Sequence, residues 1–260
     1  MKRISRLFAI LLAAALCLCP LLSCAPEEES PSGSKTLSDG KLTVGYTIYA
    51  PMNYYDDSNN FVGFDTELAC AFADSLGVEI EFVEIDWNNK LTDLASKNID
   101  VIWNGMTITD DLQAAAAVSS PYLENRQVVV CRAADAEKYT TVADVSLATS
   151  IAVEKGSAGE TVAQTANVTL NTFTAQRDTL MEVKTGASDI AIIDLTMAKT
   201  LTGEGTDYSD LVYIDVGYEN EQFGVAFRRG DEFLAAVFDL FIETCKANGT
   251  YDTLCDRYFK

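Results

Sequence analysis

The chain has 260 residues, of which 48% are hydrophobic, enough for one large domain or two modest ones with a real core. Its formal net charge is −20, so the chain as a whole would not neutralise the phosphates of a nucleic acid. We therefore expect no nucleic-acid partner. Histidine is absent from the sequence, which removes the commonest general base and metal ligand. Ser-His-Asp, Cys-His and histidine-zinc sites are therefore excluded, and we expect no metal and no cofactor.

Residues 1–23 are predicted to be a lipoprotein signal peptide. Three basic residues within the first six precede the apolar run 7–22, which is short for a membrane span and typical of a secretory signal. The run closes on Leu-Leu-Ser-Cys, which resembles a bacterial lipobox with Cys24 as the lipidated residue. A plain signal peptide cleaved near Ala25 is the alternative.

Residues 24–40 are rich in Glu, Ser and Pro and lack apolar periodicity, so we expect a flexible acidic tether with order beginning at Lys41. The protein would then be extracytoplasmic. A lipid anchor would hold it on the outer face of the cytoplasmic membrane, or on the periplasmic side in a Gram-negative cell.

Four further cysteines, Cys70, Cys131, Cys245 and Cys255, show no Cys-x-x-Cys spacing. Cys245 and Cys255 flank a predicted turn, so a disulfide between them is one alternative outside the cytoplasm. Four separate, mostly buried thiols are the other.

Strands and helices alternate in the first half of the chain, which predicts a mainly parallel sheet. Apolar or alternating runs predict strands at 42–46, 78–82 and 99–103. An aromatic-rich loop is expected at 48–55, and helices are expected from Phe64 to Gly77 and around 91–95.

The stretch 99–122 is the most informative. A buried strand is expected to turn at Gly105, and a helix to start at Thr109, a good N-cap residue. Ligands of open α/β sheets bind beyond the carboxyl ends of strands. The residues placed there are Asn104, Gly105, Met106 and Thr107. An ordinary strand-to-helix connection is the alternative.

The second half repeats the alternation of strand and helix. Strands are expected at 127–131, 150–153, 168–173, 189–193, 213–216 and 223–227, and helices at 176–184, 231–248 and 250–259. The turn 154–159 should open a helix whose first N–H groups suit an anion. The chain crosses near residue 122 and returns near residue 222, which predicts a hinge between two lobes.

From Leu42 to Phe259 the chain resembles family 3 of the extracellular solute-binding proteins, which deliver polar amino acids to ABC importers. The motifs that carry the resemblance are Val62-Gly63-Phe64-Asp65, Glu67-Leu68-Ala69, Asp100-Val101, Gly105-Met106-Thr107-Ile108-Thr109, Ser120-Pro121-Tyr122, Gly156-Ser157, Asp189 through Asp194, Phe223-Gly224-Val225-Ala226, Asn248-Gly249-Thr250 and Arg257-Tyr258-Phe259. No single motif is decisive, but their order over nearly the whole mature chain is specific.

The resemblance implies a two-lobe, type II periplasmic-binding-protein fold with a ligand cleft between the lobes and a two-strand hinge. Lobe 1 would comprise residues 41–122 and 224–260, and lobe 2 residues 127–218. A monomer is expected.

The same resemblance assigns roles to residues of the cleft. Tyr49 and Trp87 would sandwich an apolar or cationic ligand group. The Gly105 N–H, the Thr107 N–H and hydroxyl, Ser157 and the Ala158 N–H would bind a carboxylate. Asp194 would pair with the ligand's ammonium. Alternatively, the two aromatic residues only cover loop surface and Asp194 only caps the following helix.

Leu112 stands where the family pattern has an arginine that clamps the ligand carboxylate. Losing that pair costs roughly 2–4 kcal/mol of affinity. Arg126 and Lys155 are the basic residues nearest the cleft in sequence. The ligand is therefore expected to lack a free α-carboxylate or to be held by Lys155 and backbone donors, unless tight amino-acid binding has been lost.

The function we expect is non-enzymatic capture of an amino acid or a derivative for a membrane ABC permease. A sensory binding module that works with a separate receptor is one alternative. A cyclic-amino-acid dehydratase on the same scaffold is another, for which Glu154 and Lys155 are poor candidates as acid or base.

Overall fold

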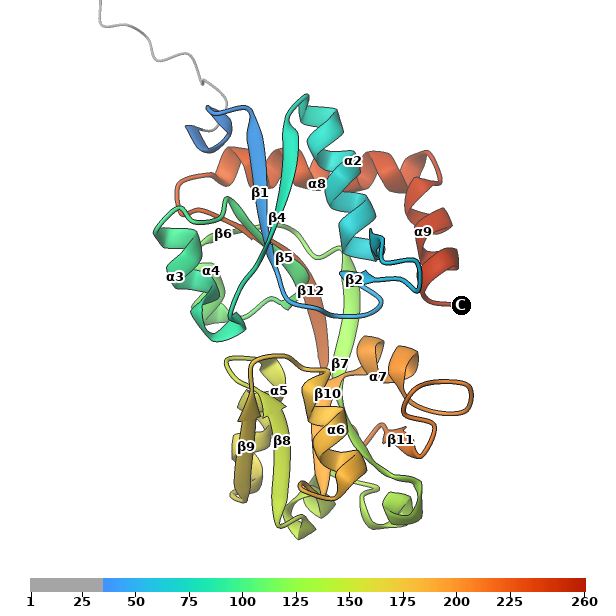
Figure 1. The fold of residues 1–260 in the computed structure, drawn as a ribbon. Helices are drawn as coiled ribbons and strands as arrows, with labels where there is room; N and C mark the ends of the chain where they lie inside the picture. The colour runs from blue at the N-terminus through green and yellow to red at the C-terminus, as the bar shows by residue number, and fades with distance from the viewer. Residues whose placement is uncertain (1–34) are drawn as a thin grey trace, which may run out of the picture. The chain divides into compact units, whose positions relative to one another are not determined.

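Residues 35–260 are described by the computed structural model, and all fall within the compact unit Ser34–Lys260. They form a mixed sheet of ten strands with helices packed against it (Figure 1). The strands are β1 (Lys41–Tyr46), β4 (Glu79–Glu84), β5 (Val101–Thr107), β6 (Ala117–Val118), β7 (Leu123–Arg132), β8 (Ser150–Glu154), β9 (Thr169–Phe173), β10 (Ile190–Asp194), β11 (Leu211–Ile214) and β12 (Asn220–Phe227), beside the hairpin β2 (Tyr54–Tyr55) and β3 (Phe61–Val62).

The helices follow the periodicity of the sequence closely. They are α2 (Phe64–Leu76), α3 (Lys90–Ala95), α4 (Asp110–Ala115), α5 (Ala158–Ala163), α6 (Asp178–Thr185), α7 (Leu195–Leu201), α8 (Glu232–Ala247) and α9 (Thr250–Tyr258). Short 3₁₀ turns lie at Lys35–Leu37, Trp87–Asn89, Ala133–Lys138, Val142–Leu147 and Gln164–Ala166. No helix within residues 35–260 is both long and apolar enough to span a membrane.

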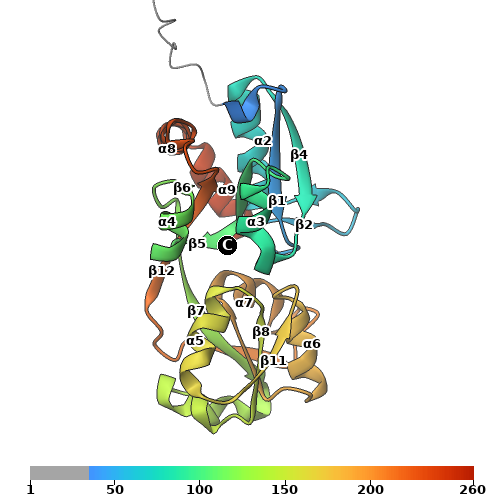
Figure 2. The ribbon, with the colours of Figure 1, turned by 90° about the vertical axis from the view of Figure 1, so that its left-hand side faces the viewer.

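Two strands carry the chain between two lobes. The strand order is β4-β1-β5-β12-β7-β10-β8-β9, with β6 beside β12 and β11 beside β7. The first half of β7 pairs with β12, and its second half pairs with β10 and β11. Figure 2 shows β7 running from one lobe into the other. The predicted two-lobe α/β fold is thus confirmed, while the residue bounds of the lobes stay a prediction.

The expectation of a mainly parallel sheet is wrong at the centre. Strands β1, β4 and β5 pair in parallel, as do β8, β9 and β10. Every pair that includes β7 or β12 is antiparallel. These two strands connect the lobes, so no crossover helix within one lobe sets their direction.

Strand β5 does not turn at Gly105, as the sequence suggested, but continues to Thr107. Gly105 has φ 55° within the strand, and the register with β12 shifts between Gly224 and Ala226. A glycine in the left-handed region is absorbed here as an irregularity of the ladder. Strands β7 and β12 likewise begin earlier than predicted, at Leu123 and Asn220.

Residues before Lys41, where order was predicted to begin, are already part of the folded structure. Thr36 is 8% exposed and hydrogen-bonds to Asp231, and Leu37 packs against the core. The predicted signal peptide 1–23, the lipidation site Cys24 and the tether up to residue 34 lie outside the described residues.

Each lobe has its own apolar support for the cleft. In lobe 1 the rings of Trp103 and Phe238 pack nearly perpendicular with centroids 4.9 Å apart, joining β5 to α8. In lobe 2 Val129, Ile151 and Ile192 are fully buried.

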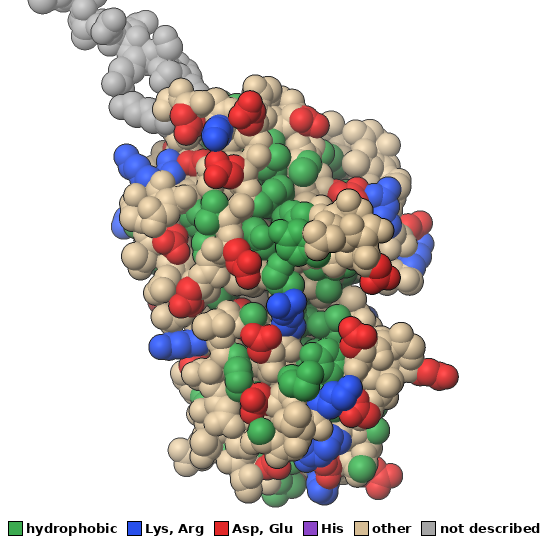
Figure 3. Space-filling view, viewed as in Figure 1, with side chains coloured by type: hydrophobic (Ala, Val, Ile, Leu, Met, Phe, Trp, Pro, Cys, Tyr) green, Lys and Arg blue, Asp and Glu red, His purple; other side chains and the backbone are tan. Residues whose placement is uncertain are grey.

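All four cysteines of the described chain are free, so the Cys245–Cys255 disulfide is not formed. On the face seen in Figure 3, acidic and basic side chains are interspersed.

Candidate functional site

A cavity of about 340 Å³ lies where the carboxyl ends of β5, β8 and β10 face one another. Both lobes line it, and its size is at the lower end of small-molecule sites, which span about 300–1,000 Å³. All ten predicted ligand residues are in its wall: Tyr49, Trp87, Asn104, Gly105, Met106, Thr107, Leu112, Ser157, Ala158 and Asp194. This is their location, and their contact with a ligand stays a prediction.

The polar floor of the cavity is Asp194, at the end of β10 and 4% exposed. Its carboxylate accepts hydrogen bonds from the side-chain amides of Asn125 at 2.5 Å, Gln127 at 2.8 Å and Gln176 at 2.7 Å. No Lys or Arg of residues 35–260 forms an ion pair with it. Burial raises the pKa of Asp194 to about 6 although the amides oppose this. The side chain makes no capping hydrogen bond to α7, so the helix-cap alternative is wrong.

A second buried carboxyl lies near Asp194. Glu154, at the end of β8, is 3% exposed and lines the cavity. Its Oε1 has no hydrogen-bond partner within residues 35–260. Burial, and then the charge of Asp194, raise the pKa of Glu154 to about 8 against the opposing effects of Lys90 and Gln176. Glu154 is therefore largely protonated at neutral pH and can donate a proton in a hydrogen bond.

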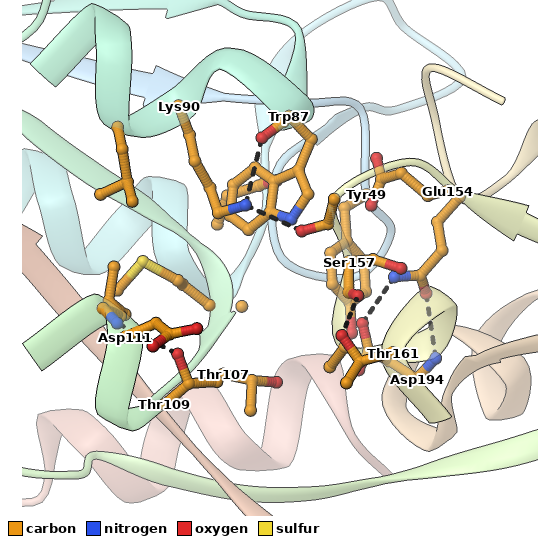
Figure 4. Close-up of a pocket in the computed structure, with 18 residues that line it drawn as sticks. Tyr49, Trp87, Lys90, Thr107, Thr109, Asp111, Glu154, Ser157, Thr161 and Asp194 are labelled. Atoms are coloured by element: carbon orange, nitrogen blue, oxygen red, sulfur yellow. Dashed lines mark hydrogen bonds between the residues drawn. The ribbon is translucent and has the colours of Figure 1, made fainter. Parts of the chain in front are cut away.

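Lys90, the first residue of α3, is the cation of the cavity. Its Nζ lies 4.8 Å from the centroid of the Trp87 ring and donates to the Trp87 carbonyl at 3.2 Å. It also donates to the Gly156 carbonyl of lobe 2 at 2.8 Å (Figure 4). Burial lowers the pKa of Lys90, and the charges of Glu154, Asp86 and Glu160 oppose that change.

Two of the β5 groups predicted to bind a carboxylate, the Gly105 N–H and the Thr107 hydroxyl, already donate to acidic side chains of the protein. The Gly105 N–H donates to Asp65 at 2.7 Å, so this donor is already engaged within the protein, and its contact with a ligand carboxylate stays a prediction. The Thr107 hydroxyl donates to Glu221 at 3.1 Å. Gly105 instead serves packing, because a Cβ there would lie 2.8 Å from the Tyr49 ring.

The turn before α5 is also already occupied by an acidic side chain. The carboxylate of Glu160 accepts from the Gly156 N–H at 2.7 Å, and the Ser157 hydroxyl caps the helix by accepting from the Glu160 N–H at 3.1 Å. The negative charge expected from a ligand at this helix start is thus supplied in part by the chain itself.

Thr109 caps α4 as predicted, accepting from the Leu112 N–H at 3.2 Å. Leu112 is 4% exposed and presents an apolar surface to the cavity where the family pattern has an arginine. The two basic substitutes suggested by the sequence are wrong. Arg126 pairs with Asp215, and Lys155 is exposed outside the cavity wall.

Eight residues of the cavity wall were not among the predicted ligand residues. These are Lys90, Leu91, Thr109, Asp111, Glu154, Gly156, Thr161 and Gln176. One of them, Glu154, had been named only as a poor candidate for an acid or base. Thr109 and Asp111 were placed on the correct helix, and Glu154 and Gly156 in the correct turn. Lys90 and Gln176 carried no local signal, because tertiary closure alone brings them to the cavity.

Comparison with known proteins identifies the family. Residues 42–260 match the bacterial extracellular solute-binding proteins, family 3. The chain belongs to this family. Family membership confirms the resemblance noted in the sequence and establishes a solute-binding scaffold.

Relatives within the family have different activities. The arginine-binding extracellular protein ArtP of Bacillus subtilis is 29% identical over 96% of each chain. A crystal structure of a mutant of the arginine-binding protein of T. maritima superposes with a TM-score of 0.79 at 32% identity, covering 85% of this chain and 96% of that one. Cyclohexadienyl dehydratase of Pseudomonas aeruginosa is 27% identical over 53% of this chain and 52% of its own.

Proposed function

We propose that this protein is the substrate-binding lipoprotein of an ABC importer. It captures a small amino acid or amino-acid-like solute by closure of the two lobes and hands it to a membrane permease. The observation that carries the proposal is Asp194, a buried carboxylate that accepts from three amides but has no Lys or Arg ion-pair partner within residues 35–260. An unpaired buried charge is costly, and the ammonium group of a solute is the natural partner for it.

The relatives support the same class of ligand. The names of the Bacillus subtilis and T. maritima proteins give arginine as what they bind. A cavity of about 340 Å³ that is lined from both lobes suits a solute of the size of an amino acid. The cavity also differs from the family pattern at Leu112, so we do not assign arginine to it.

A thermal-shift screen of amino acids, amines and modified amino acids tests binding, because a ligand of the native state raises the melting temperature. For a solute that binds, small-angle scattering should show a smaller radius of gyration at saturation. An unchanged radius would count against lobe closure. A screen without any shift would overturn solute capture itself.

Membrane anchoring is tested separately at Cys24. The wild-type protein should fractionate with membranes and carry acyl groups, while Cys24→Ala should be released or remain unprocessed. Unacylated wild-type protein found free outside the cell would contradict the lipoprotein assignment.

A dehydratase is the second candidate, favoured by one observation. Glu154 is a buried carboxyl in the cavity with a pKa of about 8, which suits a general acid at neutral pH. A cyclic amino acid that binds the protein should be followed by NMR during long incubation. Turnover that is lost in Glu154→Gln would establish the enzyme, and binding without turnover would favour capture.

A further inference from the structure

Lys90 lies against Trp87 in the wall of the cavity. The sequence predicted that Trp87 contacts the ligand's apolar or cationic group. In the structure the ammonium of Lys90 already lies over that ring, 4.8 Å from its centroid. One face of the Trp87 ring is therefore already occupied by a cation of the protein.

The ammonium is held firmly but retains capacity for a ligand. It donates to the carbonyls of Trp87 and Gly156, which lie on opposite sides of the cleft. An ammonium has three N–H donors, and these contacts use two of them. No carboxylate of residues 35–260 forms an ion pair with Lys90.

The charges around Lys90 make a consistent pattern. Lys90 is the only Lys or Arg in the described cavity wall, whose acidic members are Asp111, Glu154 and Asp194. Among the charges that raise the pKa of Lys90, that of Glu154 has the largest effect, yet Glu154 is largely protonated at neutral pH. Within residues 35–260, the ammonium of Lys90 thus has no carboxylate in an ion pair, just as Asp194 has no Lys or Arg.

We infer that Lys90 is the anion-binding and specificity-determining residue of this cavity, taking over the role that residue 112 lacks. The ligand is a zwitterion whose ammonium group lies at Asp194 and whose anionic group lies at Lys90. A solute with a cationic end at Trp87, such as arginine or a diamine, is rejected by repulsion from the Lys90 ammonium. This inference rests on the proposed solute-binding function.

The largely protonated Glu154 fits the same ligand. Glu154 lines the cavity, and its Oε1 is buried and lacks a hydrogen-bond partner within the described chain. As a neutral carboxyl it can donate to an anionic ligand group beside Lys90, while as a carboxylate it would repel that group. Lys90 and Glu154 together therefore form a polar subsite in the cavity whose wall also includes Leu112.

Matched ligands and matched variants test the inference by calorimetry. The ligands are ω-amino acids of increasing chain length, each paired with the diamine of equal length, together with L-glutamate and L-lysine as an α-amino pair. The variants are Lys90→Gln, which keeps an N–H donor for the carbonyls but removes the charge, and Lys90→Met, which removes both. Lys155→Met is the control, because it removes an exposed lysine from the neighbouring turn.

The wild type should bind the acid-ended member of a pair more tightly than the cation-ended member. Lys90→Gln and Lys90→Met should reduce this preference by about tenfold or more, and Lys155→Met should leave it unchanged. A wild-type preference for the cation-ended member would overturn the inference. A preference for the acid-ended member that stays within about twofold of the wild-type value in both variants would also overturn it, because Lys90 would then only hold the lobes together. Failure of every solute to bind would overturn the proposed function, and this inference with it.

Discussion

Asp194 carries its charge in the cavity at an energetic cost that a solute can relieve. Burial raises its pKa to about 6, well above the usual value for an aspartate. A solute ammonium pairs with the ionised form only, so a proton must leave Asp194 before the solute binds at low pH. We therefore expect affinity to fall by about tenfold for each pH unit below about 6, and to level off above it.

The measurement is a calorimetric titration series at pH values across this range. Asp194→Asn is the control, because it keeps the shape of the side chain and lacks the titrating group. Its weaker binding should show no such fall below about pH 6. The same pH profile in wild type and variant would mean that another group, such as Glu154, governs binding.

Leu112 is the second residue at which the ligand class can be tested. It lies in the first turn of α4 and faces the cavity, so an arginine there would reach toward a carboxylate beside Thr107. Leu112→Arg should create or strengthen binding of free α-amino acids by about tenfold or more. It should also weaken a ligand without an α-carboxylate, because an unpaired cation would be left in the cavity.

Leu112→Met is the matched control, because it keeps an apolar side chain of similar volume. Calorimetry on all three proteins with one amino-acid panel decides the matter. Micromolar or tighter binding of standard amino acids by the wild type would sink the idea that the ligand is altered.

Among the elements, strand β5 and helix α2 are joined by a buried carboxylate, which holds the cavity-lining part of β5 in place. Asp65 in α2 accepts from the Gly105 N–H at 2.7 Å and from the Tyr122 hydroxyl at 2.8 Å. It is fully buried, and desolvation raises its pKa to about 7 in spite of these bonds. The joint fixes the strand that carries Asn104 to Thr107.

The pH dependence of folding tests this joint. The pKa of Asp65 is higher in the folded chain than in the unfolded chain. Its contribution to stability is therefore fully present below about pH 4 and is lost as the pH rises through about 7. Relative to Asp65→Asn, the free energy of unfolding of the wild type should fall over this window by up to about 4 kcal/mol. Urea unfolding of both proteins at several pH values measures the difference, and a constant difference would contradict the assignment.

Elements with a strong period could be predicted from the sequence, and elements that depend on the partner lobe could not. The alternation of buried and exposed residues located β4, and Thr109 located the start of α4. The turn predicted at Gly105 was wrong. A glycine in a sequence suggests a turn, but here β12 pairs with β5 on both sides of Gly105, and the strand continues.

The same distinction holds for the site. Ten wall residues were found because the resemblance is local in sequence. The replacement for the missing arginine was sought at Arg126 and Lys155, close to the cleft in sequence. It is supplied by Lys90, whose place in the cavity depends on its contact with Gly156 in the other lobe.

For the whole molecule, Gly156 is a point where the two lobes approach each other closely. A Cβ at this position would lie 2.9 Å from the Asn88 Cα across the cleft. Gly156→Ala should therefore hold the lobes apart and lower ligand affinity by about tenfold or more, because closure would strain the backbone of both lobes.

Gly205→Ala is the matched control, since Gly205 also has positive φ but a Cβ there would meet no atom within 4 Å. Both variants should lose about 1–3 kcal/mol of stability from backbone strain. Only Gly156→Ala should lose affinity in calorimetry. Equal affinities for the two variants would show that the lobes do not close at this contact.

The central claim is that the cavity captures a solute through its ammonium group at Asp194. The most direct test is calorimetry at about pH 7 on wild type and Asp194→Asn, with a solute identified by thermal shift. The wild type should bind one solute per chain, and the folded variant should bind it about thirtyfold more weakly or worse, since a charge-assisted hydrogen bond is lost. Equal binding by a folded Asp194→Asn protein would contradict the account.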